Sequence, residues 1–358
     1  MRPCALCVVF ILSAVSGCSL TVTQVVSPSE LDSAERGSFT DDGRFFAIGT
    51  HPSGRSDAGA WIVEVTTGSA SGYVVTNYLA GTLEGTSDGT LSGAPAGDAC
   101  TFSGMKAQGK RIYAACVGVT PEWRAALLEI DTQARTVRAG YFTSCNAEPA
   151  SSPCDPTRLY PNGMAIDAAG RIYVSNMLEH LQLANDTPTI EIEGQGSIRQ
   201  ISVSENSPDA RTLVFTHREW FGSDILTDGV GPNGVQIEDQ TLYYAAGPNI
   251  NRVEIGSDGR AGASSVHYQG PALSYIDDFG VLDGRMLLAR TLPPALVALD
   301  RPAPFGTAPE LGTHDMGWDE IPSSVSYQAD VPAGNSVFPA GSAIITSEFG
   351  GGLYVVAF

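Results

Sequence analysis

Side chains that could bind a cation recur at one position of a repeated sequence pattern. The pattern is an apolar run, a tight turn and a second apolar run, as in "YPNGMAIDAAGRIYVSN" over 160–176 and "GPNGVQIEDQTLYYAAG" over 231–247. Aligning the copies on their turns places four oxygen-bearing residues at the same point, seven or eight residues before the turn: Glu35, Asn162, Asn233 and Asp277.

Two carboxylates and two amide carbonyls form a donor set that suits a hard cation. Calcium takes about 6–8 oxygen ligands in flexible geometry, with water completing the shell. If the four side chains converge, the pattern predicts a site for a divalent cation, most simply Ca²⁺. The alternative is that Asn-Gly and Asp only form turns where strands begin. The other two copies are weaker, because the second offers Ser103 and the sixth offers only Pro339 or Ala340.

The elements that would position these residues are β-hairpins, because each copy is an alternating run, a turn and a second alternating run. Most copies are followed by a third and a fourth apolar run, which is typical of the blades of a β-propeller. The first strand of each blade lines the central channel, so the aligned residues would meet at its mouth. Six copies occur, at 35–50, 102–116, 161–175, 232–246, 277–290 and 336–348.

We therefore expect an all-β fold, a six-bladed β-propeller of four-stranded antiparallel blades over residues 35–358. A large β-sandwich is the competing fold, but it does not explain why one hairpin type recurs. The sixth unit stops after its third strand, at the end of the chain. Residues 20–26, "LTVTQVV", alternate well and would supply the missing outer strand, which removes the last unpaired edge. This strand belongs to an N-terminal segment over 18–34.

Residues 1–17 are similar to a bacterial lipoprotein signal peptide. One Arg precedes an apolar run that is too short to span a bilayer. The run ends in the tetrapeptide VSGC, so Cys18 would be lipidated and become the mature N-terminus. Ser19 follows, where an Asp would favour inner-membrane retention, so we expect an outer-membrane lipid anchor, facing the periplasm or the outside. An ordinary signal peptide with a chance cysteine is the alternative.

Four cysteines remain after the signal segment and Cys18: Cys100, Cys116, Cys145 and Cys154. An even count in an oxidising compartment predicts two disulfides. The first two flank a hairpin and fall almost opposite each other, and the last two bracket a short loop. A metal site is the rival interpretation, but the sequence has no CxxC and no histidine close to either pair.

The charge of the chain excludes one class of partner. The formal net charge is −19 at pH 7. Nucleic acid is not expected as a partner, because phosphate contacts need clustered Lys and Arg. The sequence also lacks an HExxH motif and a P-loop. No motif of zinc-protease or nucleotide chemistry is therefore present.

The series "PNGMAID…GRIYVS", "PNGV…TLYYA" and "IDDFGV…GRMLLAR" resembles the gluconolactonase, senescence-marker-protein and regucalcin family, and more distantly the paraoxonases and strictosidine-synthase-like propellers. The resemblance covers about residues 35–300. It implies a six-bladed propeller with a divalent cation at the channel mouth that hydrolyses lactones or related esters. Carried over, the family's ligands fall on Glu35, Asn162, Asn233 and Asp277. The family usually has Gly before its first-blade Glu and Pro soon after; here Ala34 and Arg36-Gly37 stand there.

Two functions remain open from the sequence. The first is a metal-dependent hydrolase of small lactones or esters, in which Asp277 or Asp278 takes a proton from the attacking water. The second is a non-enzymatic, lipid-anchored propeller that binds a protein or glycan, with a cation that only stabilises the fold. Gaps in the ligand ring, at Ser103 and Ala340, would favour the second. In either case we expect a monomer.

Overall fold

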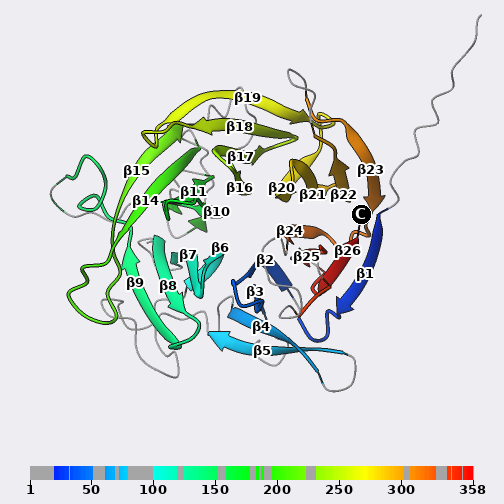
Figure 1. Cartoon of the computed structure of the whole chain (residues 1–358), viewed down its shortest axis with the longest axis horizontal. Helices are drawn as coiled ribbons and strands as arrows, with labels where there is room; N and C mark the ends of the chain where they lie inside the picture. The colour runs from blue at the N-terminus through cyan, green and yellow to red at the C-terminus, as the bar shows by residue number, and fades with distance from the viewer. Residues whose placement is uncertain are drawn as a thin grey trace, which may run out of the picture.

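Six four-stranded sheets surround a central channel, like the blades of a propeller (Figure 1). The computed structural model describes residues 20–31, 33–50, 61–68, 72–79, 100–118, 125–151, 153, 159–177, 183–184, 187–188, 196–222, 231–301, 307–327, 337–339, 341–348 and 350–357. Every regular element in these ranges is a strand, which confirms the predicted all-β propeller. None of the described residues forms a helix that is long and apolar enough to cross a membrane.

Each blade runs from the channel to the rim. Blade 1 is β2 (Ser33–Phe39), β3 (Phe45–Thr50), β4 (Trp61–Thr67) and β5 (Tyr73–Leu79); blade 2 is β6 (Cys100–Gln108), β7 (Arg111–Gly118), β8 (Ala125–Asp131) and β9 (Thr136–Tyr141); blade 3 is β10 (Pro161–Ile166), β11 (Ile172–Asn176), β14 (Ser197–Ser204) and β15 (Val214–Gly222). Blade 4 is β16 (Val235–Glu238), β17 (Thr241–Ala246), β18 (Asn249–Ile255) and β19 (Ala261–Gln269); blade 5 is β20 (Tyr275–Leu282), β21 (Arg285–Leu292), β22 (Pro294–Leu299) and β23 (Glu310–Asp315); blade 6 is β24 (Pro322–Tyr327), β25 (Ala343–Ser347), β26 (Leu353–Ala357) and β1 (Thr21–Val26). A short pair, β12 (Leu183–Ala184) and β13 (Thr187–Pro188), lies outside the blades.

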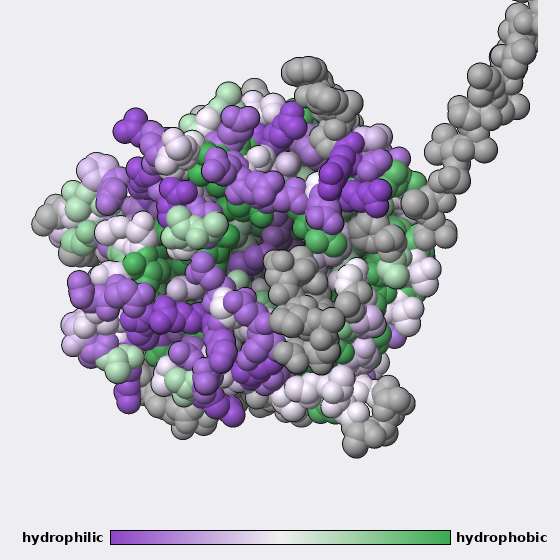
Figure 2. Space-filling view, in the orientation of Figure 1, coloured by the Kyte–Doolittle hydropathy of each residue, from purple (hydrophilic) through white to green (hydrophobic). Residues whose placement is uncertain are grey.

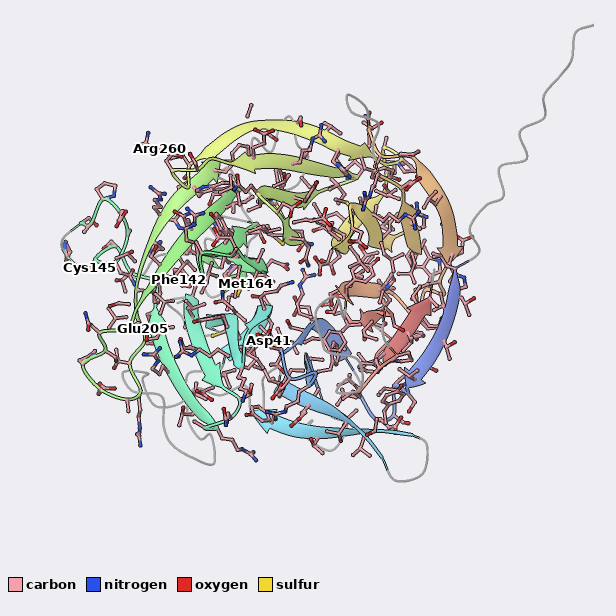
Figure 3. The ribbon with its side chains drawn as sticks, viewed as in Figure 1. Asp41, Phe142, Cys145, Met164, Glu205 and Arg260 are labelled. Atoms are coloured by element: carbon pink, nitrogen blue, oxygen red, sulfur yellow. The ribbon has the colours of Figure 1, made fainter. Side chains whose placement is uncertain are left out.

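The blades pack on one another through apolar side chains. Strands in the middle of a blade are buried on both faces, so β22 "PALVAL" is buried throughout instead of alternating. The apolar clusters each join two neighbouring blades; one brings Phe46 and Ile48 of blade 1 against Ile112 and Leu128 of blade 2. Each fully buried side chain of this size stabilises the fold by about 1.5–3 kcal/mol. Figure 3 labels two members of the next cluster, Phe142 and Met164, which pack together between blades 2 and 3.

The first and last strands close the ring, as the sequence predicts. β1 pairs antiparallel with β26, so that Val22 lies opposite Val356, and Val26 is buried against blade 1. Blade 6 is thus built from both ends of the chain. The inner strand β24 in turn contacts β2 of blade 1, and the ring has no open edge at this point.

One strand prediction is wrong. We expected the inner strand of the sixth blade within 336–348, with Pro339 or Ala340 at the channel mouth. The inner strand is instead β24, and Ser323 occupies the mouth position. Its sequence "PSSVSY" is rich in serine and gives no apolar alternation to detect. Ser323 donates to Asp277 of blade 5, Ser326 donates to the carbonyl oxygen of Gly37 of blade 1, and Ser324 bonds to Thr346 of its own blade.

The cysteine predictions are tested in part. Cys100 lies opposite Gly118 and Cys116 opposite Phe102, so the first two cysteines sit on adjacent strands, two positions apart in register. Cys116 and Cys145 are both disulfide-bonded. Cys154 and the side chain of Cys100 lie outside the described residues, so the pairing itself stays a prediction. The signal segment 1–17 and Cys18 also lie outside them.

Candidate functional site

The start of nearly every inner strand carries a β-bulge. The register shifts between Ala34 and Arg36 in β2, and between Ile276 and Asp278 in β20. A bulge bends the strand and re-aims its side chains. Shifts at the same point occur in β6, β10 and β24, and Asn233 lies two residues before β16. The residues at this point of the six blades form the hub ring: Glu35, Ser103, Asn162, Asn233, Asp277 and Ser323.

Glycines after three of the ring residues let the chain segments of blades 2 to 5 approach one another closely at the hub. A Cβ at Gly104 would lie less than 3.0 Å from the carbonyl oxygen of Asn162. A Cβ at Gly163 would collide in the same way with the carbonyl oxygen of Asn233, and one at Gly234 with Asp278. The main chains of blades 2 to 5 are therefore in contact at the hub, and only glycine fits at these points.

The centre of the hub is filled by the guanidinium group of Arg36, which follows Glu35 in β2. Its Nη2 donates to Oδ1 of Asn162 and, at 3.1 Å, to Oδ1 of Asn233. The same nitrogen lies 3.5 Å from Oδ1 of Asp277. Three of the predicted cation ligands are thus brought together, and a nitrogen atom of this chain contacts all three.

The second terminal nitrogen of Arg36 binds on the other side. Nη1 lies 2.9 Å from Oδ2 of Asp278 and donates to the carbonyl oxygen of Ser323 at 3.3 Å. Arg36 is only 3% exposed. Burial alone would lower the pKa of Arg36, but Asp278 and Asp277 outweigh it and raise this pKa, so the group stays charged.

The acceptors around Arg36 are themselves held in place. Asp277 accepts hydrogen bonds from Oγ of Ser323 at 2.7 Å and from Nδ2 of Asn233 at 2.5 Å. Nδ2 of Asn233 also donates to the hydroxyl of Tyr275 at 2.9 Å. These bonds fix the orientation of the Asn233 amide, so its oxygen points to the guanidinium.

Glu35 takes a different position from the other three predicted ligands. Among the described residues no hydrogen bond joins its carboxyl group to Asn162, Asn233 or Asp277; its carbonyl oxygen accepts from Oγ1 of Thr346 at 3.0 Å. Burial raises the pKa of Glu35 well above its ordinary value, although Arg36 acts in the opposite direction. Burial therefore favours the neutral form of the Glu35 carboxyl group.

The hub does not fit a divalent cation while the Arg36 side chain is in this position. Calcium contacts its oxygen ligands at about 2.3–2.6 Å. An ion at that distance from the oxygens of Asn162, Asn233 and Asp277 would fall on Nη2 of Arg36. Within the described ranges, no group of three or more His, Cys, Asp or Glu side chains is arranged to hold a metal. The hub already contains its cation.

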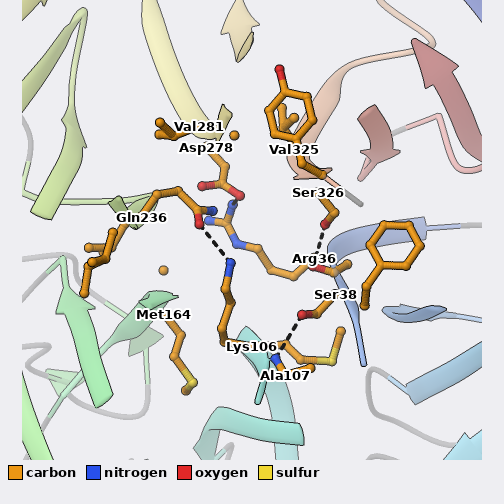
Figure 4. A pocket seen from close by; sticks show the side chains of 18 of the residues that line it. Arg36, Ser38, Lys106, Ala107, Met164, Gln236, Asp278, Val281, Val325 and Ser326 are labelled. Atoms are coloured by element: carbon orange, nitrogen blue, oxygen red, sulfur yellow. Dashed lines mark hydrogen bonds and ion pairs between the residues drawn. The ribbon is translucent and has the colours of Figure 1, made fainter. Parts of the chain in front are cut away.

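A cavity of about 280 Å³ lies beside the hub in the channel. Its charged lining includes Arg36, Lys106 and Asp278, and Gln236 and Ser326 add polar groups (Figure 4). Nζ of Lys106 donates to Oε1 of Gln236 at 2.9 Å. Hydrophilic side chains also surround the centre of the face seen in Figure 2. A volume of this size can take a small molecule.

The pKa values of two charged groups in the cavity, Lys106 and Asp278, are shifted in opposite directions. Burial lowers the pKa of Lys106, and Asp278 partly offsets this effect. Burial raises the pKa of Asp278, and Arg36 opposes it. Ionisable groups with such shifts in a cavity mark a candidate site.

Sequence reasoning missed Arg36, Ser323 and Lys106. The residue after the ring position is Gly104, Gly163 or Gly234 in blades 2 to 4, whereas blade 1 has Arg36. That break in the pattern was a usable signal. Ser323 gave no such signal, because the inner strand of blade 6 was predicted at 336–348 and not at Pro322–Tyr327. A single lysine in an apolar strand, such as Lys106, does not reveal which groups it faces.

Comparisons place the chain in a fold class. No model of a known protein family matches the sequence, and no curated protein is significantly similar to it. A luciferin-regenerating enzyme matches 95% of this chain and 96% of its own, with 11% identity and a TM-score of 0.53. A streptogramin B lyase matches 94% and 97%, with 10% identity and a TM-score of 0.50.

The chain is therefore a six-bladed β-propeller whose solved neighbours include propeller enzymes. At this level of identity the likeness shows the shared fold alone. The narrower resemblance to the gluconolactonase-like family agrees with the fold, and what it implies about activity remains a proposal.

Proposed function

We propose that the protein is a hydrolase of small lactones or related esters, and that the reaction takes place in the channel cavity beside Arg36. The observation that carries the proposal is the juxtaposition of Lys106, Asp278 and Arg36 around a cavity of ligand size. A carboxylate and two cations can together activate water and stabilise an oxyanion, which are the two needs of ester hydrolysis.

The roles follow from the contacts of each group. Asp278 takes a proton from water as the water oxygen bonds to the carbonyl carbon. Lys106 donates a hydrogen bond to the carbonyl oxygen as it gains negative charge. When the carbonyl re-forms, the bond to the ester oxygen breaks, and the proton held by Asp278 passes to that oxygen. The salt bridge of 2.9 Å to Arg36 keeps the Asp278 carboxylate oriented.

This scheme contains no metal step, because the predicted ligand oxygens of Asn162, Asn233 and Asp277 already surround Arg36. Asp277, the other predicted proton acceptor, is fully engaged with Ser323 and Asn233, so we assign it a positioning role. The calcium dependence expected from the sequence is not part of the proposed function.

A second candidate is a propeller that binds a ligand without turnover. In this case the cation site expected from the sequence would have only a structural role or be vestigial. One observation favours it. Both terminal nitrogens of Arg36 are saturated by acceptors, as in a group that holds blades together. The ligand would be a small molecule in the channel, or a protein or glycan on the loops. Lipid anchoring through Cys18 would suit this role equally.

The test is turnover of a panel of aryl esters and sugar lactones by the soluble chain that begins at Leu20, after dialysis against a chelator. We expect hydrolysis that survives the chelator and that falls at least about 100-fold in Asp278→Asn and in Lys106→Met. Asp258→Asn and Lys110→Met are matched controls, because both residues are exposed. Saturable ligand binding without turnover would support the second candidate and contradict the first.

A further inference from the structure

The hub contains the oxygen ligands of a cation site, but the cation among them is the guanidinium group of Arg36. Five oxygens surround the guanidinium, from Asn162, Asn233, Asp277, Asp278 and the main chain of Ser323. They come from four different blades, and Arg36 comes from a fifth. Calcium sites use carboxylates, amide carbonyls and main-chain carbonyls, which are the groups present here.

The fit of the guanidinium is incomplete. Nε of Arg36 is buried and has no hydrogen-bond partner among the described residues. A guanidinium group carries five N–H donors in a fixed fork, so a site shaped for arginine would meet all of them. The oxygens instead crowd the terminal nitrogens from several directions. The oxygens therefore match the positive charge of Arg36 and its terminal nitrogens, but not its complete set of donors.

We propose that Arg36 is a built-in cation that takes the place of a divalent ion at the hub, and that removing its side chain converts the hub into a divalent-cation site. The position of Arg36 supports this. In blades 2 to 4 the corresponding residue is Gly104, Gly163 or Gly234, which has no side chain to offer the hub. One substitution at this position therefore decides whether the centre is filled by the chain.

The charge balance supports the second part of the proposal. Without Arg36, the buried carboxylates of Asp277 and Asp278 would repel each other and lose the cation that contacts both of them, and the weaker effect of Lys106 on Asp278 would remain. Buried charges are retained only when they are paired or coordinate a metal. A divalent cation would restore the balance, and water would complete the shell beside the amide oxygens of Asn162 and Asn233.

The experiment is a titration of chelator-treated protein with CaCl₂ by calorimetry, repeated with TbCl₃ by luminescence. The variants are Arg36→Ala, Arg36→Lys and the double variant Arg36→Ala/Asp277→Asn. We expect Arg36→Ala to gain one calcium site per chain that binds at least tenfold more tightly than any site of the wild type. Arg36→Lys keeps a cation and should gain none, and the double variant should lose at least tenfold in affinity.

The thermal stability gives an independent readout. The melting temperature of the wild type should not change on adding a chelator, whereas that of Arg36→Ala should rise with calcium. If Arg36→Ala unfolds in the chelator, circular dichroism should show that it refolds when calcium is added. A calcium ion bound at the hub of the wild type, or an Arg36→Ala protein that gains no site and does not respond to calcium, would overturn the proposal. Neither result depends on catalytic activity.

Discussion

Arg36 joins blade 1 to blades 3, 4, 5 and 6 through a single buried group. Its stabilising effect depends on its partners, because a buried charge that loses its counter-charge costs far more than the pair contributes. The partially exposed pair of Arg44 and Glu64, at 2.7 Å, is a useful contrast, since water can solvate either group when the other is removed.

We expect Asp277→Ala to lower the free energy of unfolding by about 3–5 kcal/mol, because it removes one of the two carboxylates around Arg36 and leaves the buried donors of Ser323 and Asn233 without their acceptor. Glu64→Ala should cost only about 1 kcal/mol or less. Urea denaturation of the two variants and the wild type measures both values. Equal, small losses in the two variants would mean that the guanidinium group is not confined in the hub.

Two buried histidines make stability depend on pH. Burial lowers the pKa of His217 from 6.5 to about 4; Nε of Arg199 donates to its Nδ1 at 3.2 Å, which requires an unprotonated nitrogen. Burial likewise lowers the pKa of His267 to about 4. Between pH 6.5 and 4 the unfolded chain binds these protons and the folded chain does not. Stability from these groups is therefore complete above pH 6.5 and is lost as the pH falls.

The matched variant is His217→Gln, which keeps a donor and an acceptor but does not titrate. From pH 7 to pH 4.5 the unfolding free energy of the wild type should fall more steeply with pH than that of the variant. The difference between the two slopes should correspond to the uptake of up to about one extra proton on unfolding. The comparison cancels the effect of Glu35 and Asp278, whose raised pKa values act in the opposite direction. Parallel curves would show that the pKa of His217 is the same in the folded and unfolded states, which contradicts the prediction.

At the scale of the strand, the hub is made by a bulge followed by a glycine. The bulge turns a ring residue to the axis, and the glycine lets the next inner strand touch the main chain. Gly104→Ala should therefore lower the free energy of unfolding by about 2 kcal/mol or more, because its Cβ would meet the carbonyl oxygen of Asn162.

The control for this change is Gly72→Ala. A Cβ at Gly72, in blade 1, would meet no atom within 4 Å, so this variant should stay within about 0.5 kcal/mol of the wild type. Chemical denaturation of both variants tests the claim. A Gly104→Ala protein as stable as Gly72→Ala would show that blades 2 and 3 do not touch at the hub.

Strand-scale patterns also explain what the sequence could predict. Alternating apolar runs separated by tight turns identified five of the six inner hairpins, since apolar faces and positive-φ turns leave residue-level marks, as at Gly170 with a φ of 78°. The convergence of Asn162, Asn233 and Asp277 followed from aligning those turns. It could not be predicted that the guanidinium group of Arg36 fills the hub. The direction of this side chain depends on the bulge between Ala34 and Arg36, and bulges have no fixed sequence. β24 was missed because it is serine-rich.

At the scale of the molecule, the ring is closed by pairing the two ends of the chain. β1 covers the edge of β26 and contributes Val26 to the packing between blades 6 and 1. A chain that begins after β1 would expose an unpaired strand, which is a template for association with other molecules. The closure thus contributes to both stability and solubility.

We expect a chain that begins at Ser27 to lose at least about 2 kcal/mol of unfolding free energy relative to one that begins at Leu20, from lost strand pairing and valine burial. It should also form oligomers in light scattering, while the longer chain stays monomeric. A shorter chain that is equally stable and monomeric would mean that β1 does not complete blade 6.

The most direct test of the account is a crystal structure of the wild-type chain grown in calcium chloride, at a resolution that separates a guanidinium from an ion. We predict planar density for Arg36, with its nitrogens near 3 Å from the oxygens of Asn233 and Asp278. A round peak with anomalous signal, about 2.3–2.6 Å from the oxygens of Asn162, Asn233 and Asp277 and with Arg36 turned away, would contradict it.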